Sequence, residues 1–519
     1  MAFILGLFIC LPTAMARDTV EQWGMFDLAL KGPTNGNPFL DITFSARFAH
    51  DPAGDTAIRA TGFYDGEGTY RVRFMPPQRG RWHYFTESRC PELNGKSGEF
   101  TVGAPGAKNH GPVFVTNTFH FAYADGRLFK QIGTTCYAWI HQNPALEEQT
   151  LKTLAAAPFN KIRFCVFPKH YDWNTNEPPL YPFEGTPPRT WDTTRFNPKF
   201  FQHLEQRVAD LRDLGLEADL ILFHPYDEGH WGFDRMTAAA DDRYLRYVVS
   251  RLAAFRNIWW SLANEYDFMK EKRETDWDRF LQIVQAGDPY GHLRSIHNGR
   301  LLYNHTLPSV THASIQNGSA VEDAGRAVLY RDVYRKPIVF DEVKYEGNIR
   351  HRWGNLSAQE MVFRFWEGTI AGTYVGHGET YLDAADILWW SKGGVLHGQS
   401  PARLAFLRQV LEESPAEGID PIDKWQNPQF GGQAPQYYLV YFGKDKPTSW
   451  KFELPKPKLE DGLKFRAEVL DTWNMTTTPV DGMFTVRKET DYIFADRAGR
   501  AVALPGRPYI ALRIKRIEP

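Results

Sequence analysis

The chain has 519 residues, of which 43% are hydrophobic and 24% charged, and its formal net charge is −2. This balance is typical of soluble globular proteins, and the length favours about three domains. The charge is not basic enough for nucleic-acid binding, and no block of like charges indicates a membrane surface. We therefore expect neither nucleic acid nor membrane among its partners.

The first residues predict a signal peptide. An apolar run from Ala2 to Leu11 is followed by Ala14-Met15-Ala16, which has the A-x-A form of a cleavage site. The run is too short to span a bilayer, although no Lys or Arg precedes it. We interpret residues 1–16 as a signal peptide and expect a periplasmic or secreted protein.

The cysteines do not indicate a disulfide framework. Without Cys10 of the leader, Cys90, Cys136 and Cys165 remain, an odd number without paired spacing. Cys136 and Cys165 lie in apolar runs and are most simply core residues. No C-x-x-C or H-E-x-x-H spacing occurs, so we expect no structural zinc site.

Residues 17–108 have the pattern of a β-sandwich. "GTYRVRFMPP" alternates Tyr70, Val72 and Phe74 with two arginines, and "RGRWHYFTES" follows after a Pro-Pro-Gln-Arg-Gly turn. Alternation with period two on both sides of a turn predicts a β-hairpin. The segment "GEFTVGAPGAKNHGP" is rich in Gly, Pro and Asn, so we interpret it as a linker.

Residues 109–418 alternate strand and helix patterns. Helical stretches such as 198–215 and 241–255 lie between apolar runs. Eight such units predict a (β/α)8 TIM barrel, with a doubly wound sheet as the alternative. The candidate strands are 130–139, 160–168, 216–225, 257–265, 293–298, 312–318, 336–343 and 371–378.

Polar residues at the ends of the strands favour the barrel. His224, Asn264-Glu265, His297-Asn298 and Asp341-Glu342 each follow an apolar run. In a barrel all strand C-termini open on one face, so these side chains would converge there. The connection between the fifth and sixth strands looks too short for a helix.

Residues 419–519 return to a β pattern and predict a C-terminal β-sandwich. The strand runs are "QYYLVYFG", "KFRAEVLDTWN" and "PYIALRIKRI", separated by Pro, Gly and Asp turns.

Two glutamates carry the chemistry that the pattern suggests. "IWWSLANEYD" is a buried strand that ends on Asn264 and Glu265, and "KPIVFDEV" ends on Asp341 and Glu342. The glutamates are 77 positions apart, which at roughly 25–30 residues per unit places them on strands four and seven, across the barrel mouth. Glycoside hydrolysis with retention needs such a pair, one carboxyl as acid and the other as nucleophile.

An Asn-Glu at the end of strand four and a Glu at the end of strand seven resemble the clan A glycoside hydrolases. With "GFYDGEGTYRVRFMPPQRGRWHYFT" before the barrel and a small β-domain after it, the chain resembles the apiosidase-like, family-5-related glycosidases over nearly its whole length. The resemblance implies Glu265 as acid/base and Glu342 as nucleophile. It also implies that Asn264 binds the sugar hydroxyl next to the anomeric carbon.

The sequence departs from many clan A enzymes, which place a Tyr near strand six and a Trp at strand eight. Here strand six offers Gln316-Asn317, and strand eight offers Tyr374, His377 and Glu379. We therefore expect a sugar pocket that differs from that of a standard cellulase.

The role of Glu342 has two competitors, Asp341 and Glu346. Alternation along a strand turns only one of Asp341 and Glu342 inward, and we favour Glu342. Arg163 on strand two would either steady the carboxylate of Glu342 or form a buried structural ion pair. For Glu265 the alternative is a rim carboxylate paired with a Lys or Arg.

Further residues at the strand ends are candidates for substrate binding, each with a structural alternative such as core packing or loop ordering. Tyr226 stands on the loop "PYDEGHWG", where Asp227, His230 and Trp231 would line the pocket or order the loop. The substrate-binding candidates are Asn264, Arg163, His224, Tyr137, Trp139, Tyr226, His297, Asn298, Gln316 and His377.

The main hypothesis is a retaining glycosidase that acts on a carbohydrate without a metal or organic cofactor. A metal-dependent barrel hydrolase would use His141, His224, His230, His297 or His312, but the H-x-H pair expected on strand one is absent. A non-catalytic carbohydrate-binding barrel is the third hypothesis. The long loop 169–192 favours exo-action if it closes the pocket, and the oligomeric state stays open.

Overall fold

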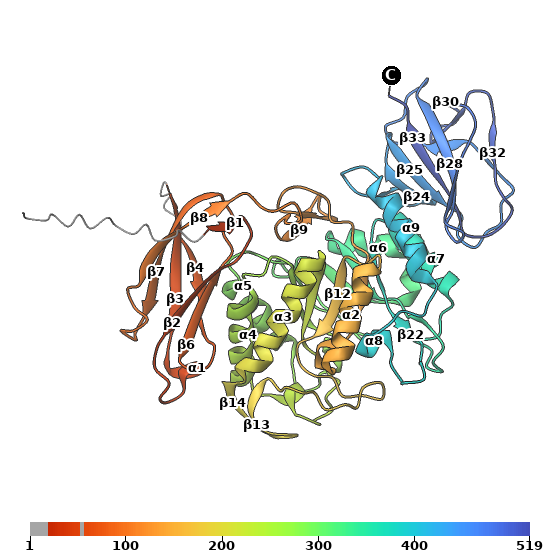
Figure 1. Cartoon of the computed structure of the whole chain (residues 1–519). Coiled ribbons are helices and arrows are strands. Elements are labelled where there is room, and N and C mark those ends of the chain that lie inside the picture. Colours follow the sequence, from red (N-terminus) through yellow and green to blue (C-terminus); the bar gives the residue numbers. More distant parts are fainter. Residues whose placement is uncertain (1–18, 52–56, 519) are drawn as a thin grey trace, which may run out of the picture. The chain divides into compact units, whose positions relative to one another are not determined.

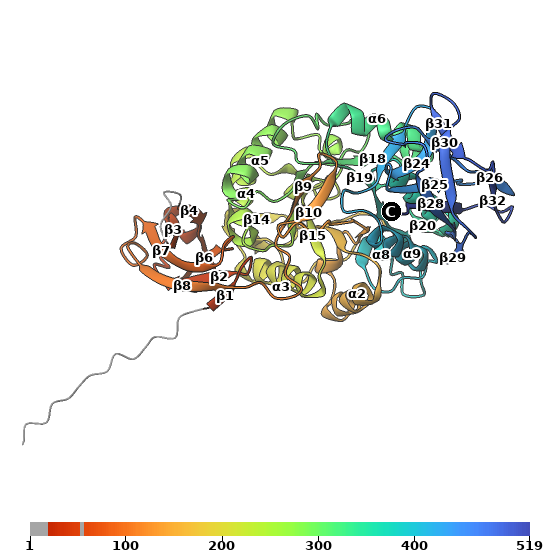
Figure 2. The same cartoon turned by 90° about the horizontal axis from the view of Figure 1, so that it is seen from above.

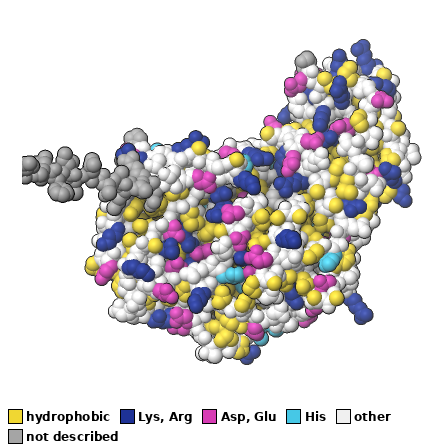
Figure 3. All heavy atoms as spheres, in the orientation of Figure 1, with side chains coloured by type: hydrophobic (Ala, Val, Ile, Leu, Met, Phe, Trp, Pro, Cys, Tyr) yellow, Lys and Arg dark blue, Asp and Glu magenta, His cyan; other side chains and the backbone are white. Residues whose placement is uncertain are grey.

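The computed structural model describes residues 19–51 and 57–518 (Figure 1). The interpreted signal peptide, residues 1–16, lies outside these residues. The chain forms two compact units, one up to Asn109 and one from His110 onward. Within the described ranges, none of the helices is both long enough and apolar enough to cross a membrane. On the face shown in Figure 3, basic and acidic side chains are interspersed.

The N-terminal unit contains two sheets whose apolar faces form its core. One sheet has the strand order β1-β8-β7-β3-β4 and the other β2-β6-β5. Phe48 of the first sheet stacks on Phe74 of the second, with 4.1 Å between ring centroids. The elements are β1 (Thr19–Glu21), β2 (Phe26–Lys31), α1 (Pro38–Asp41), β3 (Phe44–Asp51), β4 (Ile58–Thr61), β5 (Phe63–Tyr64), β6 (Thr69–Phe74), β7 (Gly80–Ser88) and β8 (Ser97–Gly103).

The predicted hairpin of β6 and β7 is wrong. Strand β6 pairs with β2 and β5, whereas β7 pairs with β3 and β8, so the two strands lie in different sheets. Both strands alternate as expected, and Tyr70, Val72 and Phe74 are buried. The segment with Pro76 and Pro77 carries the chain across to the other sheet. Alternation identifies a strand and its buried face, but it does not identify the partner strand.

Eight parallel strands form the barrel of the second unit. Their order is β17-β16-β15-β12-β11-β21-β19-β18, and a single parallel bridge between His297 and Ser314 joins the two ends. The predicted TIM barrel is confirmed, and each strand lies inside a predicted range. The strands are β11 (Gly133–Thr135), β12 (Lys161–Cys165), β15 (Glu217–Phe223), β16 (Ile258–Ala263), β17 (Arg294–Ser295), β18 (Ala313–Gln316), β19 (Ile338–Glu342) and β21 (Tyr374–His377).

Helices surround the barrel, as Figures 1 and 2 show. Residues 296–312, all of them described, connect β17 to β18 without a helix, which confirms the expectation for this connection. The helices are α2 (Pro144–Ala156), α3 (Pro198–Leu214), α4 (Ala238–Leu252), α5 (Glu274–Gly287), α6 (Ala324–Tyr334), α7 (Ala358–Ile370), α8 (Trp389–Lys392) and α9 (Ser400–Glu412).

A two-stranded hairpin of β9 (Val113–Thr116) and β10 (His120–Tyr123) covers the N-terminal end of the barrel. Phe121 of this hairpin packs on Trp259 and Tyr374, with ring centroids 5.0 and 5.1 Å away. Because this end is filled with apolar side chains, only the opposite end is available for a site.

The C-terminal strands form a second β-domain with its own apolar core. Its largest sheet has β33 between β25 and β28, and Tyr441 of β25 stacks on Trp366 of α7 at 5.4 Å. The strands are β23 (Asp420–Asp423), β24 (Asn427–Gln433), β25 (Tyr437–Tyr441), β26 (Ser449–Lys451), β27 (Glu453–Pro455), β28 (Lys464–Asp471), β29 (Thr476–Pro479), β30 (Phe484–Lys488), β31 (Ile493–Asp496), β32 (Ala501–Ala503) and β33 (Ile510–Arg516).

Candidate active site

A cavity of about 760 Å³ opens at the C-terminal ends of the barrel strands. The segment that follows each of the eight barrel strands contributes at least one residue to its wall. Both Glu265 and Glu342 line it, together with Asn264. This is the end of the barrel at which the catalytic groups of TIM-barrel enzymes lie.

The turn after β16 presents Glu265 to the cavity. All six residues of β16 are buried, and Glu265 then takes a left-handed conformation with φ = 49°. Such a conformation is costly for a residue with a side chain and is typical of functional sites. The carboxylate of Asp267 accepts hydrogen bonds from the backbone N–H groups of Gly299, Arg300 and Leu301, so the connections after β16 and β17 are tied together.

Glu265 is a buried carboxyl group whose pKa is raised. The Tyr226 hydroxyl donates to Oε2, and Asn264 Nδ2 lies 3.2 Å from the same oxygen. These bonds favour the charged form, but burial and the negative charge of Glu342 outweigh them and raise the pKa of Glu265 to about 7. This environment suits a general acid.

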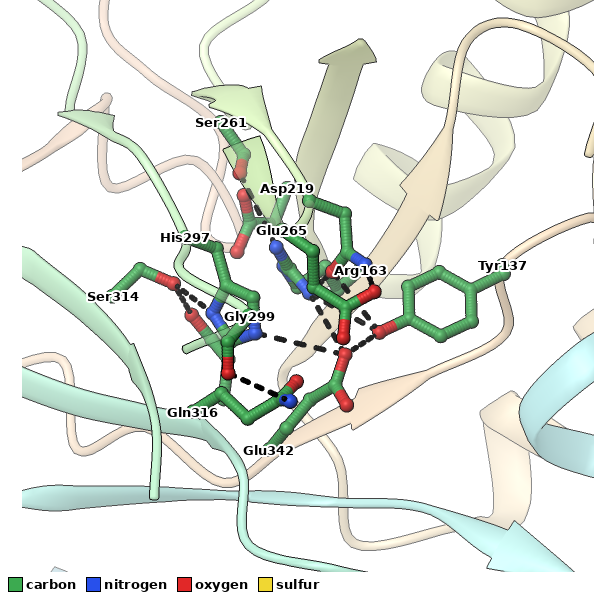
Figure 4. Close-up of polar contacts among 12 residues, drawn as sticks. Tyr137, Arg163, Asp219, Ser261, Glu265, His297, Gly299, Ser314, Gln316 and Glu342 are labelled. Carbon is green, nitrogen blue, oxygen red and sulfur yellow. Dashed lines mark hydrogen bonds and ion pairs between the residues drawn. The ribbon is translucent and has the colours of Figure 1, made fainter. Parts of the chain in front are cut away.

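Glu342 accepts hydrogen bonds from two side chains and lies near Arg163 and His297 (Figure 4). The Tyr137 hydroxyl donates to Oε1, and the Trp353 indole N–H donates to Oε2 at 3.1 Å. A nitrogen of Arg163 lies 3.8 Å from Oε1, and His297 Nε2 lies 3.6 Å from it. Burial lowers the pKa of His297 well below its ordinary value, so this ring is neutral. The hydrogen bonds from Tyr137 and Trp353 hold this carboxylate in place beside the Arg163 guanidinium.

Asn264 and Arg163 connect the two glutamates. Arg163 donates to Asn264 Oδ1 at 2.7 Å and reaches towards Ser261 Oγ at 3.5 Å. The amide of Asn264 is thereby oriented with its nitrogen towards Glu265, while its oxygen lies 3.2 Å from the Tyr137 hydroxyl. Arg163 is fully buried beneath the cavity and is not part of its wall. Its position is that of a positioning residue rather than of the predicted substrate contact.

Asp341 and Glu342 both turn inward, which contradicts the expected alternation. Asp341 accepts hydrogen bonds from Lys161 Nζ at 3.0 Å and from Ser314 Oγ at 2.5 Å, inside the barrel. The pairing of β18 and β19 shifts by one residue just before Glu342, and this bulge turns Glu342 into the cavity. Although burial opposes it, the Lys161 ammonium holds the pKa of Asp341 well below its usual range.

Glu346, the other competitor, lies away from the cavity. The backbone N–H groups of Gln399 and Ser400, at the start of α9, donate to its carboxylate at 2.8 and 3.1 Å. With His377 and Glu379 it forms the only group in the described part of the chain that could hold a metal ion. The histidines of the metal-hydrolase hypothesis are not part of that group.

Several predicted substrate contacts are buried and do not line the cavity. His377 bonds Thr134 Oγ1 at 3.0 Å and stacks on Phe159. Trp139 packs on Phe164. The ring nitrogens of His224 lie 3.2 Å from Phe167 O and Tyr226 N, so His224 orders backbone. The remaining two are the buried residues Asn298, bonded to the Gln316 backbone, and His297, bonded to Ser314.

Four of the predicted contacts do line the cavity: Asn264, Tyr137, Tyr226 and Gln316. Gln316 has a free side-chain oxygen, while its nitrogen donates to Gly299 O at 3.3 Å. On the loop after β15, Asp227 caps the backbone N–H groups of Trp231 and Phe233 at 2.7 and 2.6 Å. Asp227 therefore orders this loop, which was the structural alternative to contact with the pocket.

Lys169, Tyr171, Trp353 and Trp390 are among the wall residues that were not predicted as contacts from the sequence. Trp390 belongs to α8, and its ring lies 5.8 Å from that of Tyr137. A tryptophan does therefore follow strand eight, which corrects the departure inferred from Tyr374, His377 and Glu379. Trp390 lies well beyond His377, the last residue of β21, so no pattern at the strand end identifies it.

Comparisons with known proteins agree with this architecture. Residues 116–426 match the model of the apiosidase-like catalytic domain, and residues 19–89 and 425–515 match two domains of unknown function, DUF5060 and DUF5605. A candidate glycoside hydrolase from Bacteroides vulgatus ATCC 8482 is 44% identical with a TM-score of 0.93, covering 96% of this chain and 100% of its own.

Two more distant structures show the same fold. One is named glycoside hydrolase, with 15% identity and a TM-score of 0.57 over 78% of this chain and 96% of its own. The other is a family 5 glycoside hydrolase from Bacteroides vulgatus ATCC 8482, with 14% identity and a TM-score of 0.54. The match covers 78% of this chain and 93% of its own. No curated protein matches the chain. With 44% identity over almost the entire length and a match that spans the barrel, the chain belongs to the apiosidase-like family of glycoside hydrolases.

Proposed function

We propose that this glycoside hydrolase works by double displacement with net retention, with Glu342 as nucleophile and Glu265 as acid/base. The observation that carries the proposal is the contrast between two carboxyl groups in one cavity. Glu265 has a pKa raised to about 7. Glu342, in contrast, accepts hydrogen bonds from Tyr137 and Trp353 and lies beside the Arg163 guanidinium. Environments that separate the protonation of two neighbouring carboxyls assign the acid and the base.

In the first step, an Oε of Glu342 attacks the anomeric carbon while the proton of Glu265 moves to the leaving oxygen. The glycosidic C–O bond breaks as the bond to Glu342 forms. In the second step, Glu265, now ionised, removes a proton from water, and the water oxygen displaces Glu342 from the anomeric carbon. Asn264 lies beside Glu265, where its amide N–H can reach the adjacent sugar hydroxyl.

We further propose exo-action on a plant or bacterial poly- or oligosaccharide. The support is that all eight connections wall the cavity and that residues 169–173 and 175, at the start of the long loop, form part of that wall. The rest of the loop forms the hairpin β13 (Phe183–Thr186) and β14 (Thr190–Phe196). Hydrolysis of oligosaccharides labelled at the reducing end should release single sugars first, whereas mid-chain fragments would show endo-action.

The test of the mechanism is a panel of aryl glycosides of both anomers, hydrolysed by wild type, Glu265→Ala and Glu342→Ala. Both variants should lose turnover of the glycoside that the wild type accepts. Azide should restore product in both variants. In Glu342→Ala azide replaces the nucleophile, so the glycosyl azide should have the opposite anomeric configuration to the substrate. In Glu265→Ala azide replaces the deprotonated water, so the product should keep the configuration of the substrate.

Glu217→Gln is the matched control. Glu217 is buried at the N-terminal end of β15, bonds the Trp259 indole at 3.0 Å, and has a pKa raised to about 8 by burial. It is therefore neutral at pH 7, and glutamine changes neither its charge nor its size. The control should keep wild-type turnover. Turnover that survives in both alanine variants would exclude the assigned roles.

A further inference from the structure

Lys169 is a buried lysine in the wall of the catalytic cavity. It follows β12 by four residues and is 1% exposed. Its Nζ lies 3.7, 4.0 and 4.3 Å from the ring centroids of Tyr137, Tyr226 and Tyr171. The ring of Trp390 is 5.6 Å away. Four aromatic rings thus surround the ammonium group.

Within residues 19–51 and 57–518, no acceptor meets this ammonium through a hydrogen bond or an ion pair. Lys161 is equally buried, but Asp219 and Asp341 meet it at 2.6 and 3.0 Å. Burial lowers the pKa of Lys169, whereas the two carboxylates overcome burial and raise that of Lys161. The faces of aromatic rings attract a cation but accept no conventional hydrogen bond. The three N–H donors of Lys169 are therefore available to acceptors on a bound molecule.

The ammonium lies over the rings of the two tyrosines that hydrogen-bond the catalytic glutamates. The two rings nearest to it belong to Tyr137 and Tyr226, whose hydroxyls donate to Glu342 and Glu265, respectively. One tyrosine ring thus links Lys169 to each glutamate, and the charges of both glutamates act on its ammonium. If the anomeric carbon lies between the glutamates, as the proposed function requires, the sugar ring attached to it comes within reach of the Lys169 donors.

We infer that Lys169 is a substrate-binding residue that donates hydrogen bonds to hydroxyl oxygens of the sugar in the catalytic subsite. The inference rests on the proposed function and adds the sugar class to it. The sugar is neutral, because a carboxylate on it would lie beside Glu342 as well as beside Lys169. It must also carry a free hydroxyl at the position facing Lys169, since an ammonium desolvated by the sugar needs that acceptor.

The test compares Lys169→Met with wild type on the aryl glycoside that wild type hydrolyses best and on its monodeoxy analogues. On the parent glycoside, kcat/KM should fall about 10- to 150-fold, the effect of losing a hydrogen bond to a charged group. On one or two deoxy analogues, wild type should already be impaired and the substitution should add less than about 3-fold. This non-additivity identifies the hydroxyl that Lys169 contacts.

Lys130→Met is the matched control. Lys130 is partly buried outside the cavity and donates to Ser414 O at 3.0 Å, so its loss should leave kcat/KM unchanged. Thermal melts of Lys169→Met and Lys130→Met show whether each variant is folded. Lys169→Arg, which keeps the charge, should retain more activity than Lys169→Met on the parent.

Equal losses on the parent and on every deoxy analogue would overturn the inference, because Lys169 would then act without touching a hydroxyl. A second experiment measures binding without turnover. Calorimetry follows the binding of each glycoside of the panel to Glu342→Gln and to the double variant Glu342→Gln/Lys169→Met. Binding that Lys169→Met does not weaken, or no binding to any glycoside, overturns it too. Failure of the proposed function looks different, since it appears as turnover that survives in Glu342→Ala.

Discussion

The hydroxyl of Tyr137, which follows the first barrel strand, donates a hydrogen bond to Glu342 at the end of the seventh. Strand β21 lies between these two strands in the sheet. The contact therefore depends on the closure of the barrel. It places a donor on the oxygen of Glu342 that also faces Arg163 and His297.

Tyr137→Phe should lower kcat/KM about 10-fold or more, because Glu342 loses the donor that orients its attacking oxygen. Steady-state kinetics on the aryl glycoside checks this. The control is Tyr374→Phe, which removes a partly buried hydroxyl that contacts His120 at 3.0 Å at the other end of the barrel. Equal rates for wild type and Tyr137→Phe would contradict the orienting role.

The activity of wild type should fall as the pH rises through about 7, since Glu265 must be protonated to act as the acid and its pKa is raised to about 7. Part of this shift comes from the charge of Glu342. Glu342→Gln removes that charge, so the pKa of Glu265 should fall. A carbon-13 NMR titration of the glutamate carboxyl carbons measures it, with Glu265→Gln identifying the signal. A rise or no change would rule out the coupling.

Lys161→Met should lower the free energy of unfolding by about 3–5 kcal/mol, because Asp219 and Asp341 would stay buried without their shared cation. Urea unfolding measures the loss. Adding Asp219→Asn and Asp341→Asn removes the unpaired charges and should recover a large part of it. A loss below about 1 kcal/mol for the single variant would contradict the stabilising role of the ion pairs.

Asp267→Ala should lower kcat about 10-fold while the protein stays folded. Its carboxylate holds three backbone N–H groups of the connection after β17 next to the strained turn of Glu265. Without it, Glu265 loses its fixed position, and small displacements of a catalytic group are costly. Kinetics at saturating substrate, together with a thermal melt, separates this effect from unfolding. Unchanged kcat would show that Glu265 holds its position alone.

The sequence by itself determined the barrel and its two glutamates. Apolar runs such as 258–263 are buried on both faces in a parallel sheet, so their lengths and spacing report the strands. A polar residue directly after such a run can only lie at the strand end, and Glu265 and Glu342 were found in this way. The apolar alternation of β6 likewise reported which side chains are buried.

Only the tertiary structure determined which strands pair and which side chains reach the cavity. The strand paired with β7 depends on contacts far along the chain, and the bulge before Glu342 overrides alternation. His377 is the last residue of β21, and Trp139, like Tyr137, follows β11, yet both contact residues outside the cavity wall. Lys169 carries no local signal at all. Its four rings come from four different connections, and closing the barrel is what brings them around it.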